Sequence, residues 1–336
     1  MVENDSPRRL VMTMNRSFIG GQLGPGGACM RVSLLISTYN EPAALRRCLL
    51  GVSVQSRPPD QVIVSDDGSG PETAAVLRLP ELAGLPLEHV WQKDAGWRKP
   101  RAMNLSLAHC TGDYIVFCDG DCIPRRDFVA SHLRHARPRL FLSGAIVDVP
   151  AHVHARLTDE QILDNAAFSS AVLESLCPEM RRWRCRLHPG RWESLLNLAT
   201  HRFCTLRGSN FSAWRDDLLR VNGCDEHFGY GSEDRELGAR LWNAGVRSRW
   251  LKFSLVQLHL GHPRNPDPEQ LKRQRRRFRR LFLNGTTRVE PGIDTALARG
   301  LEAAVPSRHV VIHEEARSPR TIPFPRRMVG RQRRAA

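Results

Sequence analysis

Residues 114–122, with the sequence YIVFCDGDC, join a run of β-branched and aromatic side chains to two carboxylates. The apolar run predicts a buried β-strand, and side chains two positions apart on an extended chain project to the same side. Asp119 and Asp121 are therefore expected to point together from the strand end, with Gly120 leaving room between them. Such oxygen ligands suit a hard divalent cation, Mg²⁺ or Mn²⁺. The alternative is that the Asp-Gly-Asp tripeptide only makes a turn.

Strand and helix patterns alternate through the N-terminal part of the chain. The patterns predict strands at 31–37, 61–65, 87–91 and 114–119, and helices around Leu45, Leu49 and Val52, at 73–79 and at 102–108. Such alternation is typical of βαβ crossovers, so we predict an α/β fold with a parallel sheet covered on both faces. Ligands of such sheets bind beyond the carboxyl ends of the strands, where the acidic clusters of this chain lie.

The second half of the chain has a different order of elements. It predicts helices at 159–176, 192–198, 215–221 and 233–244, and strands at 206–214 and 248–260. The helix at 233–244 begins with the pair Glu233 and Asp234, and the last strand ends with His259 and His262. Taken alone, the acidic pair could simply be first-turn residues of a capped helix.

Composition limits the class of protein. A chain of 336 residues can bury one large core, and nine scattered cysteines do not suggest a disulfide framework. Neither a long apolar run nor a secretion signal is visible, so the expected compartment is the cytoplasm. Residues 263–336 hold 18 Lys and Arg against 7 Asp and Glu, which is +11 of the net charge of +15. The nearly neutral remainder argues against a whole surface that wraps nucleic acid.

Together, these motifs resemble the inverting family 2 glycosyltransferases with the GT-A fold. The resemblance covers residues 31–264 and rests on TYNE at 38–41, DDGS at 66–69, Asp119 with Asp121, and the acidic pair. The stretch from Leu206, with its NGCDEHFGYGSED sequence, is most similar to the galactosyltransferase-type subgroup. The implied fold is one Rossmann-like domain with a mostly parallel central sheet flanked by helices.

For the chemistry, the resemblance implies a metal site and a catalytic pair. Asp119 and Asp121 match the family's metal-binding motif, and His262 with His259 matches the position of a further ligand to Mn²⁺ or Mg²⁺. Asp234 matches the general base that removes the proton of the acceptor hydroxyl, while Glu233 is expected to bond a sugar hydroxyl. A lone His is more often a packing residue than a ligand, so both histidines remain candidates.

For the donor, the resemblance places Thr38, Tyr39 and Glu41 around the nucleoside, with Asp66 or Asp67 accepting from the uracil ring. The implied donor is a nucleotide-sugar, with a UDP-linked hexose or N-acetylhexosamine favoured, and the acceptor is a glycan or a lipid-linked sugar of the cell surface. Residues 151–200 match no motif and are expected to shape the acceptor site.

The loop at 94–101 carries further donor candidates. Asp94 resembles the family's nucleoside-proximal acid, and Arg98 has the usual spacing to Asn104 and could bind phosphate oxygens. Asp119, besides its place in the metal motif, is also a candidate for binding the nucleotide. The loop departs from the commoner forms at Trp97, Lys99 and Pro100. The sequence therefore does not decide which basic side chain contacts the donor. The aromatic residues Tyr230 and Trp214 are candidates for stacking on a sugar, and for Trp214 the alternative is buried packing.

The predicted organisation is an N-terminal extension at 1–29, a domain at 30–264 with a nucleotide-binding half at 30–125 and an acceptor half at 126–264, and a basic extension at 265–336. Residues 271–283 predict a cationic helix that either binds an anionic membrane, at about 1 kcal/mol per Lys or Arg, or is simply solvated. Alternatives to a glycosyltransferase are a nucleotidyltransferase and a nucleic-acid-binding protein that uses this Arg-rich segment.

Overall fold

The computed structural model describes residues 30–200, 206–261 and 267–302. From Arg31 onward the chain forms one unit, and the predicted extension at 1–29 lies outside the described residues. The predicted strands at 31–37, 61–65, 87–91 and 114–119 match observed strands to within a residue at each end. The apolar residues of the strands at 32–38, 61–66 and 114–119 are buried, because both faces of the sheet are covered, whereas the edge strand at 87–91 is only partly buried.

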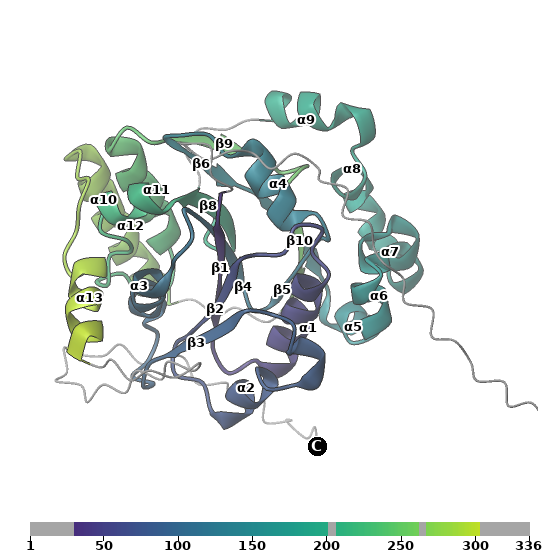
Figure 1. Ribbon diagram of the computed structural model, residues 1–336. Coiled ribbons are helices and arrows are strands. Elements are labelled where there is room, and N and C mark those ends of the chain that lie inside the picture. The colour runs from purple at the N-terminus through teal and green to yellow at the C-terminus, as the bar shows by residue number, and fades with distance from the viewer. Residues whose placement is uncertain (1–29, 201–205, 262–266, 303–336) are drawn as a thin grey trace, which may run out of the picture. The chain divides into compact units, whose positions relative to one another are not determined.

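The main sheet has the strand order β3-β2-β1-β4-β8-β6-β9 (Figure 1). Strand β8 runs antiparallel to both of its neighbours, and all the other paired strands are parallel. The sheet is therefore mostly parallel, as predicted. Its strands are β1 (Val32–Thr38), β2 (Gln61–Asp66), β3 (Leu87–Trp91), β4 (Tyr114–Asp119), β6 (Leu140–Ser143), β8 (Asn210–Trp214) and β9 (Arg247–Trp250).

A second, three-stranded sheet lies beside the end of β4. It consists of β5 (Cys122–Pro124), β10 (Val256–Leu260) and β7 (Ala145–Val149), in the order β5-β10-β7. The register of β10 places His259 opposite Cys122 on one side and Asp148 on the other. The predicted single strand at 248–260 is thus two strands in two sheets, because the chain turns between them with Leu255 N–H donating to Leu251 O.

Helices cover both sides of the main sheet, with α3 and α10–α13 on one side and α1 with α5–α8 on the other (Figure 1). The helices are α1 (Pro42–Ser53), α2 (Pro71–Val76), α3 (Lys99–His109), α4 (Phe128–His135), α5 (Ala151–His154), α6 (Asp159–Leu163), α7 (Ser170–Leu176), α8 (Arg184–Leu187), α9 (Glu193–Ala199), α10 (Arg215–Arg220), α11 (Glu233–Asn243), α12 (Pro268–Leu283) and α13 (Ile293–Glu302). Short 3₁₀ turns are found at η1 (Pro80–Leu82), η2 (Ala166–Phe168), η3 (Pro178–Trp183) and η4 (Gly190–Trp192).

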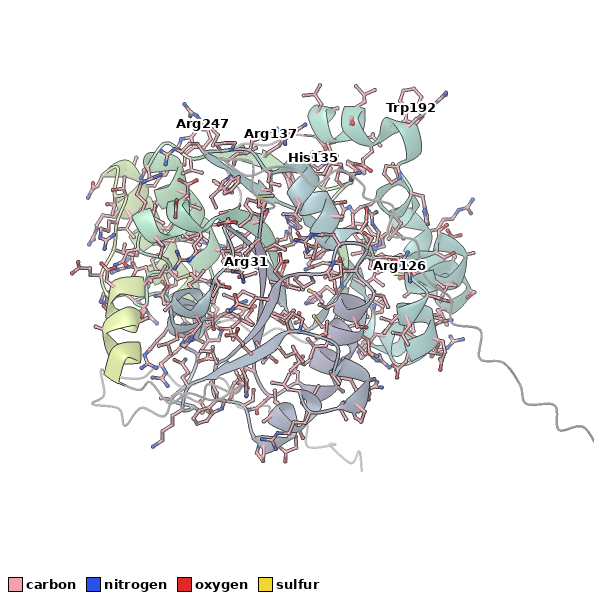
Figure 2. All side chains as sticks on the ribbon, in the orientation of Figure 1. Arg31, Arg126, His135, Arg137, Trp192 and Arg247 are labelled. Carbon is pink, nitrogen blue, oxygen red and sulfur yellow. The ribbon has the colours of Figure 1, made fainter. Side chains whose placement is uncertain are left out.

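The predicted helix at 159–176 is interrupted. Asn165 adopts a left-handed conformation with φ 67°, and the Asp164 carboxylate accepts from Ala166 N–H, so α6 ends and α7 starts anew. Farther along, α9 presents an exposed apolar face, and Trp192 projects from its start (Figure 2). The side chains of Trp192, Leu195 and Leu198 are 53%, 54% and 71% exposed.

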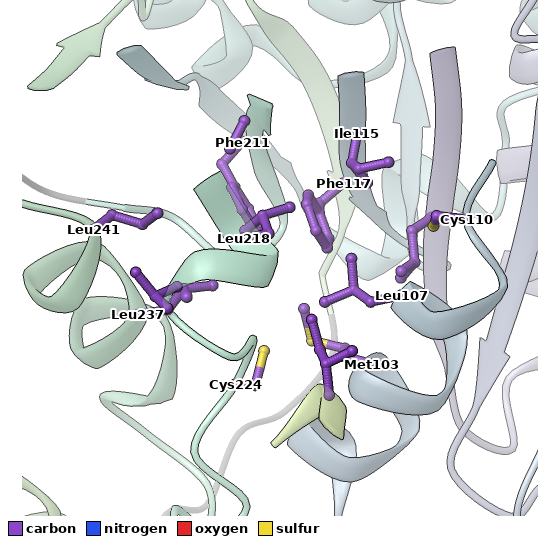
Figure 3. Packing of buried hydrophobic residues seen from close by; sticks show 14 of the residues in the cluster. Met103, Leu107, Cys110, Ile115, Phe117, Phe211, Leu218, Cys224, Leu237 and Leu241 are labelled. Atoms are coloured by element: carbon purple, nitrogen blue, oxygen red, sulfur yellow. The ribbon is translucent and has the colours of Figure 1, made fainter. Parts of the chain in front are cut away.

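One large part of the core lies between the main sheet and the helices α3, α10, α11 and α13 (Figure 3). Phe117 of β4 and Phe211 of β8 stack there with ring centroids 3.9 Å apart. Ile293 and Ala296 of α13 are buried in the same cluster. Residues 293–302, which belong to the predicted basic extension, are therefore part of the folded body, since α13 packs against α3.

Helix α12 also belongs to the body of the fold. It packs against α11, and the guanidinium of Arg277 binds the buried carboxylate of Asp225 with Nη2 2.7 Å from Oδ2. Gln274 is buried in the same contact. The sequence interpretation set a basic extension apart from residue 265 onward, whereas the described part of that segment, 267–302, is packed on the domain. Among the described helices, none combines the length and apolar character that crossing a membrane requires.

Candidate active site

The two carboxylates of residues 114–122 lie where β4 ends. Gly120 N–H donates to Ser37 O at 2.8 Å, and a Cβ at Gly120 would come within 3.2 Å of Ser37 O and Thr38 Cβ. The small residue thus allows the chain to turn tightly against the end of β1. Asp119 Oδ1 accepts hydrogen bonds from Ser37 Oγ and from Lys99 Nζ, both at 2.6 Å. Asp119 is therefore held in place from two elements.

Lys99 was not assigned a role by the sequence. It lies in the first turn of α3, and its ammonium forms a partly buried ion pair with Asp119. Burial lowers the pKa of Lys99, but the charge and hydrogen bond of Asp119, then the charges of Glu233 and Asp121, outweigh that effect and raise it above its ordinary value. The ammonium therefore stays charged and faces carboxylates from both halves of the chain.

Asp121 is paired with His259. Nε2 of His259 lies 3.5 Å from Asp121 Oδ2, while Nδ1 lies 3.0 Å from Oδ1 of Asp148. The arrangement follows from the register of the small sheet, in which His259 sits beside Asp148, and from the Leu260 N–H bond to Asp121 O at 2.8 Å. The Asp148 carboxylate thus lies beside one ring nitrogen, and the other ring nitrogen is directed at Asp121. Asp148 is a residue that sequence reasoning missed.

The donor set fits a divalent cation in its chemistry. Carboxylate and imidazole are ligands that Mn²⁺ accepts, and the His259–Asp148 contact is the outer support that a metal-bound His usually has. Within 30–200, 206–261 and 267–302, no group of three His, Cys, Asp or Glu side chains is already gathered as a complete metal site. The candidate His262 lies outside the described residues. Among the described residues, Asp121 and His259 are therefore the pair whose side chains suit a metal ion, whereas Asp119 is hydrogen-bonded to Lys99.

The acidic pair at the start of α11 lines a small cavity. Asp234 Oδ2 accepts from Gly208 N–H at 3.1 Å, and Glu233 Oε2 accepts from Gly231 N–H at 2.9 Å. Gly231 and Ser232 both have positive φ, 94° and 76°, which turns the chain sharply into the helix. Burial, followed by the charge of Asp234, raises the pKa of Glu233 to about 7. A carboxyl group with that pKa can both donate and accept protons near neutral pH.

The cavity brings distant segments together. Lys99, Pro100 and Met103 come from α3, Glu233, Asp234 and Leu237 from α11, and Leu206, Gly208, Phe211 and Cys224 complete the lining. Lys99 therefore connects this cavity to Asp119 at the end of β4. The predicted catalytic pair and the predicted metal motif, more than a hundred residues apart in sequence, are linked through one side chain.

The candidate donor residues lie after β1 and β2. Asp66 is fully engaged in its own turn, since Oδ1 accepts from Gly68 and Ser69 N–H and Oδ2 contacts His89 Nε2 at 3.0 Å. Asp67 accepts from Gln92 Nε2 and, at 2.7 Å, from Arg98 N–H. Burial raises the pKa of Asp67 to about 6, although those bonds oppose the shift.

A second group of donor candidates surrounds Asp94. Tyr39 Oη donates to Asp94 Oδ2 at 3.0 Å, and burial followed by that bond raises the pKa of Tyr39. A Cβ at Gly68, whose φ is 100°, would lie 2.5 Å from the Asp94 backbone, so the two loops touch. Thr38 is buried at the end of β1, where its carbonyl accepts from Asp67 N–H.

Glu41 and Arg98 precede helices of the same region. Glu41 O accepts from Leu45 N–H at the start of α1. Arg98 precedes α3, and its guanidinium donates to Lys93 O, so it braces the loop of residues 93–98.

The two aromatic candidates differ in position. The rings of Tyr230 and Trp97 meet edge-on, with centroids 6.0 Å apart, so Tyr230 lies beside the loop that precedes α3. Trp214 instead packs against Tyr114 at the start of β4, and its Nε1 donates to Arg137 O at 2.7 Å. Because Asp119 is at the other end of β4, the suggestion that Trp214 stacks on a sugar is wrong.

Comparison with known proteins agrees with this geometry. Residues 33–183 match the model of glycosyl transferase family 2, and residues 199–262 match that of the N-terminal domain of galactosyltransferase. The chain is 30% identical over 233 residues to validoxylamine A glucosyltransferase of Streptomyces hygroscopicus subsp. limoneus. The aligned region covers 64% of this chain and 48% of that protein. It is 28% identical over 227 residues to hyaluronan synthase of Pasteurella multocida, covering 64% and 23%. The chain thus spans half or less of these relatives.

Solved structures support the architecture. S. aureus TarS is similar with a TM-score of 0.50 and 16% identity over 81% of this chain and 43% of that chain. TarS residues 1–349 in complex with UDP give a TM-score of 0.51 at the same identity, covering 81% and 71%. At this identity the likeness concerns the fold alone. The two consecutive matches show that residues 33–183 form a glycosyl transferase family 2 domain followed by a galactosyltransferase-type segment at 199–262, and the shared architecture is the GT-A fold, as the motifs predicted.

Proposed function

We propose that this enzyme moves a sugar from a nucleoside diphosphate donor to a glycan or lipid-linked acceptor, with inversion at the anomeric carbon. The observation that carries the proposal is the cavity shared by Lys99, Glu233 and Asp234, since Lys99 also bonds Asp119 at the end of β4. Acids from both halves of the chain can then act on one substrate pair. The family assignment favours this reaction over nucleotidyl transfer and over nucleic-acid binding.

The donor nucleoside is proposed to lie over the ends of β1 and β2. Tyr39, Asp94 and Asp67 lie there on loops that contact one another, and Thr38 lies at the end of β1 beside them. Glu41, Asp66 and Arg98 are proposed to hold these loops in place. TarS was solved with UDP, so UDP is the first nucleotide to test. A UDP-linked hexose or N-acetylhexosamine is the proposed donor. The enzyme is proposed to act in the cytoplasm, in the synthesis of a polysaccharide of the cell surface.

A divalent cation, Mn²⁺ or Mg²⁺, is proposed to be held by Asp121 and His259, with Asp119 and His262 as further candidates. When bound, it would supply Lewis-acid stabilisation to the departing diphosphate. The chain's own part is to orient these ligands, since Asp148 fixes the ring of His259 and Ser37 fixes the carboxylate of Asp119.

Asp234 is proposed as the general base. Its carboxylate takes the proton of the acceptor hydroxyl while that oxygen bonds the anomeric carbon, and the bond to the diphosphate breaks with its electron pair going to the diphosphate. The hydrogen bond from Gly208 N–H keeps Oδ2 in a fixed position, which a base must have to reach the hydroxyl. Glu233, with its raised pKa, is proposed to bond a sugar hydroxyl next to it.

The test separates binding from chemistry. Asp234→Asn is expected to lower the turnover of UDP-sugars by about 10²–10⁴-fold, with UDP affinity changed by no more than about twofold. Asp121→Asn is expected to remove the gain in UDP affinity that Mn²⁺ provides. Nucleoside diphosphate release and calorimetric titration measure these quantities, with Asp216→Asn on exposed α10 as the matched control. Wild-type turnover by Asp234→Asn would rule out its role as base.

We further propose that α12 places the enzyme on an anionic membrane, near lipid-linked acceptors. Arg275, Arg276, Arg279 and Arg280 are exposed on this helix, and Phe282 and Leu283 are 43% and 81% exposed at its end. Cations beside exposed apolar groups are typical of helices that lie on a bilayer surface.

Removal of residues from 265 onward would also remove the packing of α12 and α13, so charge substitution is the better test. Replacing the four arginines by Gln is expected to abolish binding to phosphatidylglycerol-containing vesicles and to leave thermal stability unchanged. Vesicles of phosphatidylcholine alone serve as the control. Equal binding of the variant and the wild type would contradict the membrane proposal.

A further inference from the structure

Lys99 lies at the junction of the two acidic groups of the site. Its Nζ is 2.6 Å from Asp119 Oδ1, and its side chain is 20% exposed. It also lines the cavity that Glu233 and Asp234 border. The first turn of α3 fixes this position, because Pro100 follows Lys99 and is buried in the same cavity wall. The ammonium is thus aimed inward by a rigid element.

Four carboxylates lie near the ammonium of Lys99. Asp119, Asp121, Glu233 and Asp234 would together repel an anionic ligand. Lys99 brings a positive charge among them, since it bonds Asp119 and shares a cavity lining with Glu233 and Asp234. An ammonium has three donors and acts as a compact point charge, which suits phosphate oxygens. Fixed positive charge next to a departing diphosphate stabilises the charge that develops there.

We infer that Lys99 binds the diphosphate of the donor directly, while keeping its bond to Asp119. This inference rests on the proposed function, which places the diphosphate at the end of β4. Lys99 then contributes to nucleotide affinity whether or not a divalent cation is present. Arg98, the cation that the motif spacing favoured, instead donates to Lys93 O.

A purely structural role makes a different prediction. If Lys99 only neutralised Asp119, then removing both charges in Lys99→Met/Asp119→Asn would restore UDP affinity measured with EDTA, where a metal role of Asp119 does not enter. If Lys99 contacts phosphate, the double variant stays weak, because the lost contact is not replaced. The two single variants and the double variant therefore form a cycle that separates the roles.

The experiment is calorimetric titration of UDP, UMP and uridine, each with EDTA and with Mn²⁺. Lys99→Met is expected to weaken UDP binding about tenfold or more in both conditions and to leave uridine affinity within about twofold. Lys99→Arg is expected to recover part of the loss. Lys93→Met, an exposed lysine of the preceding loop, is the matched control and should bind UDP like the wild type.

Either of two results would overturn the inference: wild-type UDP affinity in Lys99→Met, or recovered affinity in the double variant. Thermal melting of each variant shows whether it is folded before titration. Failure of the proposed function looks different, because the wild-type protein would then bind no nucleotide with or without Mn²⁺. An effect of Asp121→Asn on Mn²⁺-dependent binding alone, with none from Lys99→Met, would keep the function and reject the role of Lys99.

Discussion

Arg277 of α12 forms an ion pair with Asp225, with Nη2 2.7 Å from Oδ2, and Asp225 is fully buried in the loop that leads to α11. The other oxygen, Oδ1, accepts from His227 N–H at 3.0 Å, so the carboxylate is bound on both sides. Helix α12 thereby holds the loop that ends at Glu233 and Asp234. We therefore expect α12 to help to position the catalytic pair.

Arg277→Met is the first prediction. It leaves a buried carboxylate without its cation, and since Arg277 is 40% exposed, we expect a loss of about 1–3 kcal/mol in the free energy of unfolding. Turnover is expected to fall more than UDP affinity, because the loop carries the catalytic pair. Urea denaturation and steady-state kinetics measure both. Arg276→Met, its exposed neighbour, should change neither, and equal effects of the two variants would contradict the role of the pair.

Gly68→Ala should disrupt the donor loops. The new Cβ would lie 2.5 Å from the backbone N and Cα of Asp94, at a φ of 100° that only glycine adopts easily. We expect a loss of about 2–4 kcal/mol in the free energy of unfolding and weaker UDP binding. In Gly84→Ala the added Cβ would meet no atom within 4 Å, which makes it the control. Normal UDP affinity in Gly68→Ala would show that the contact with Asp94 is not needed.

Stability should depend on pH through Asp67. Burial raises its pKa in the folded chain to about 6, against an ordinary value of 3.8, so the folded chain holds this proton more tightly. The stabilisation from protonation is complete below pH 3.8 and is lost as pH rises through 6.

In Asp67→Asn the side chain is a neutral amide at every pH in this range, so it does not titrate. The free energy of unfolding of this variant relative to the wild type should therefore increase by about 1–3 kcal/mol between about pH 4 and pH 7. Urea denaturation of both proteins across that range measures the difference. A difference independent of pH would show that the pKa of Asp67 is not raised.

Asp148→Asn addresses the support of His259. Loss of the negative charge at Nδ1 should make the ring a poorer ligand, so we expect Mn²⁺ affinity to fall about 10–100-fold. Electron paramagnetic resonance of free Mn²⁺ measures this without substrate. Asp164→Asn, which alters an exposed carboxylate in the turn after α6, should leave the affinity unchanged. If both variants bind Mn²⁺ equally, Asp148 has no part in the site.

Sequence patterns predicted the first four strands and the placement of Asp119 at the end of β4, because a buried strand leaves a continuous apolar run and its end is marked by polar residues. The role of Lys99 was missed because its contact with Asp119 depends on how the first turn of α3 faces the sheet. Asp148 was missed because its contact with His259 depends on the register between β7 and β10. Neither contact can be predicted from the spacing of nearby residues in the sequence.

The same reason explains the errors. Trp214 was a candidate because it is aromatic, but antiparallel pairing with β4 places it opposite Tyr114, at the end of β4 away from Asp119. The packing of the C-terminal segment was not predicted because most of its residues are polar or charged. Its few buried residues, such as Gln274 and Ile293, form no recognisable apolar pattern.

The edge-on contact between Trp97 and Tyr230 joins the loop before α3 to the loop before α11. Aromatic pairs of this geometry contribute about 0.5–1.5 kcal/mol beyond their burial. If either loop shifts when a substrate enters, the ring of the other loop must repack. The two substrates are therefore expected to bind in a preferred order, with the first to arrive preparing the cleft for the second.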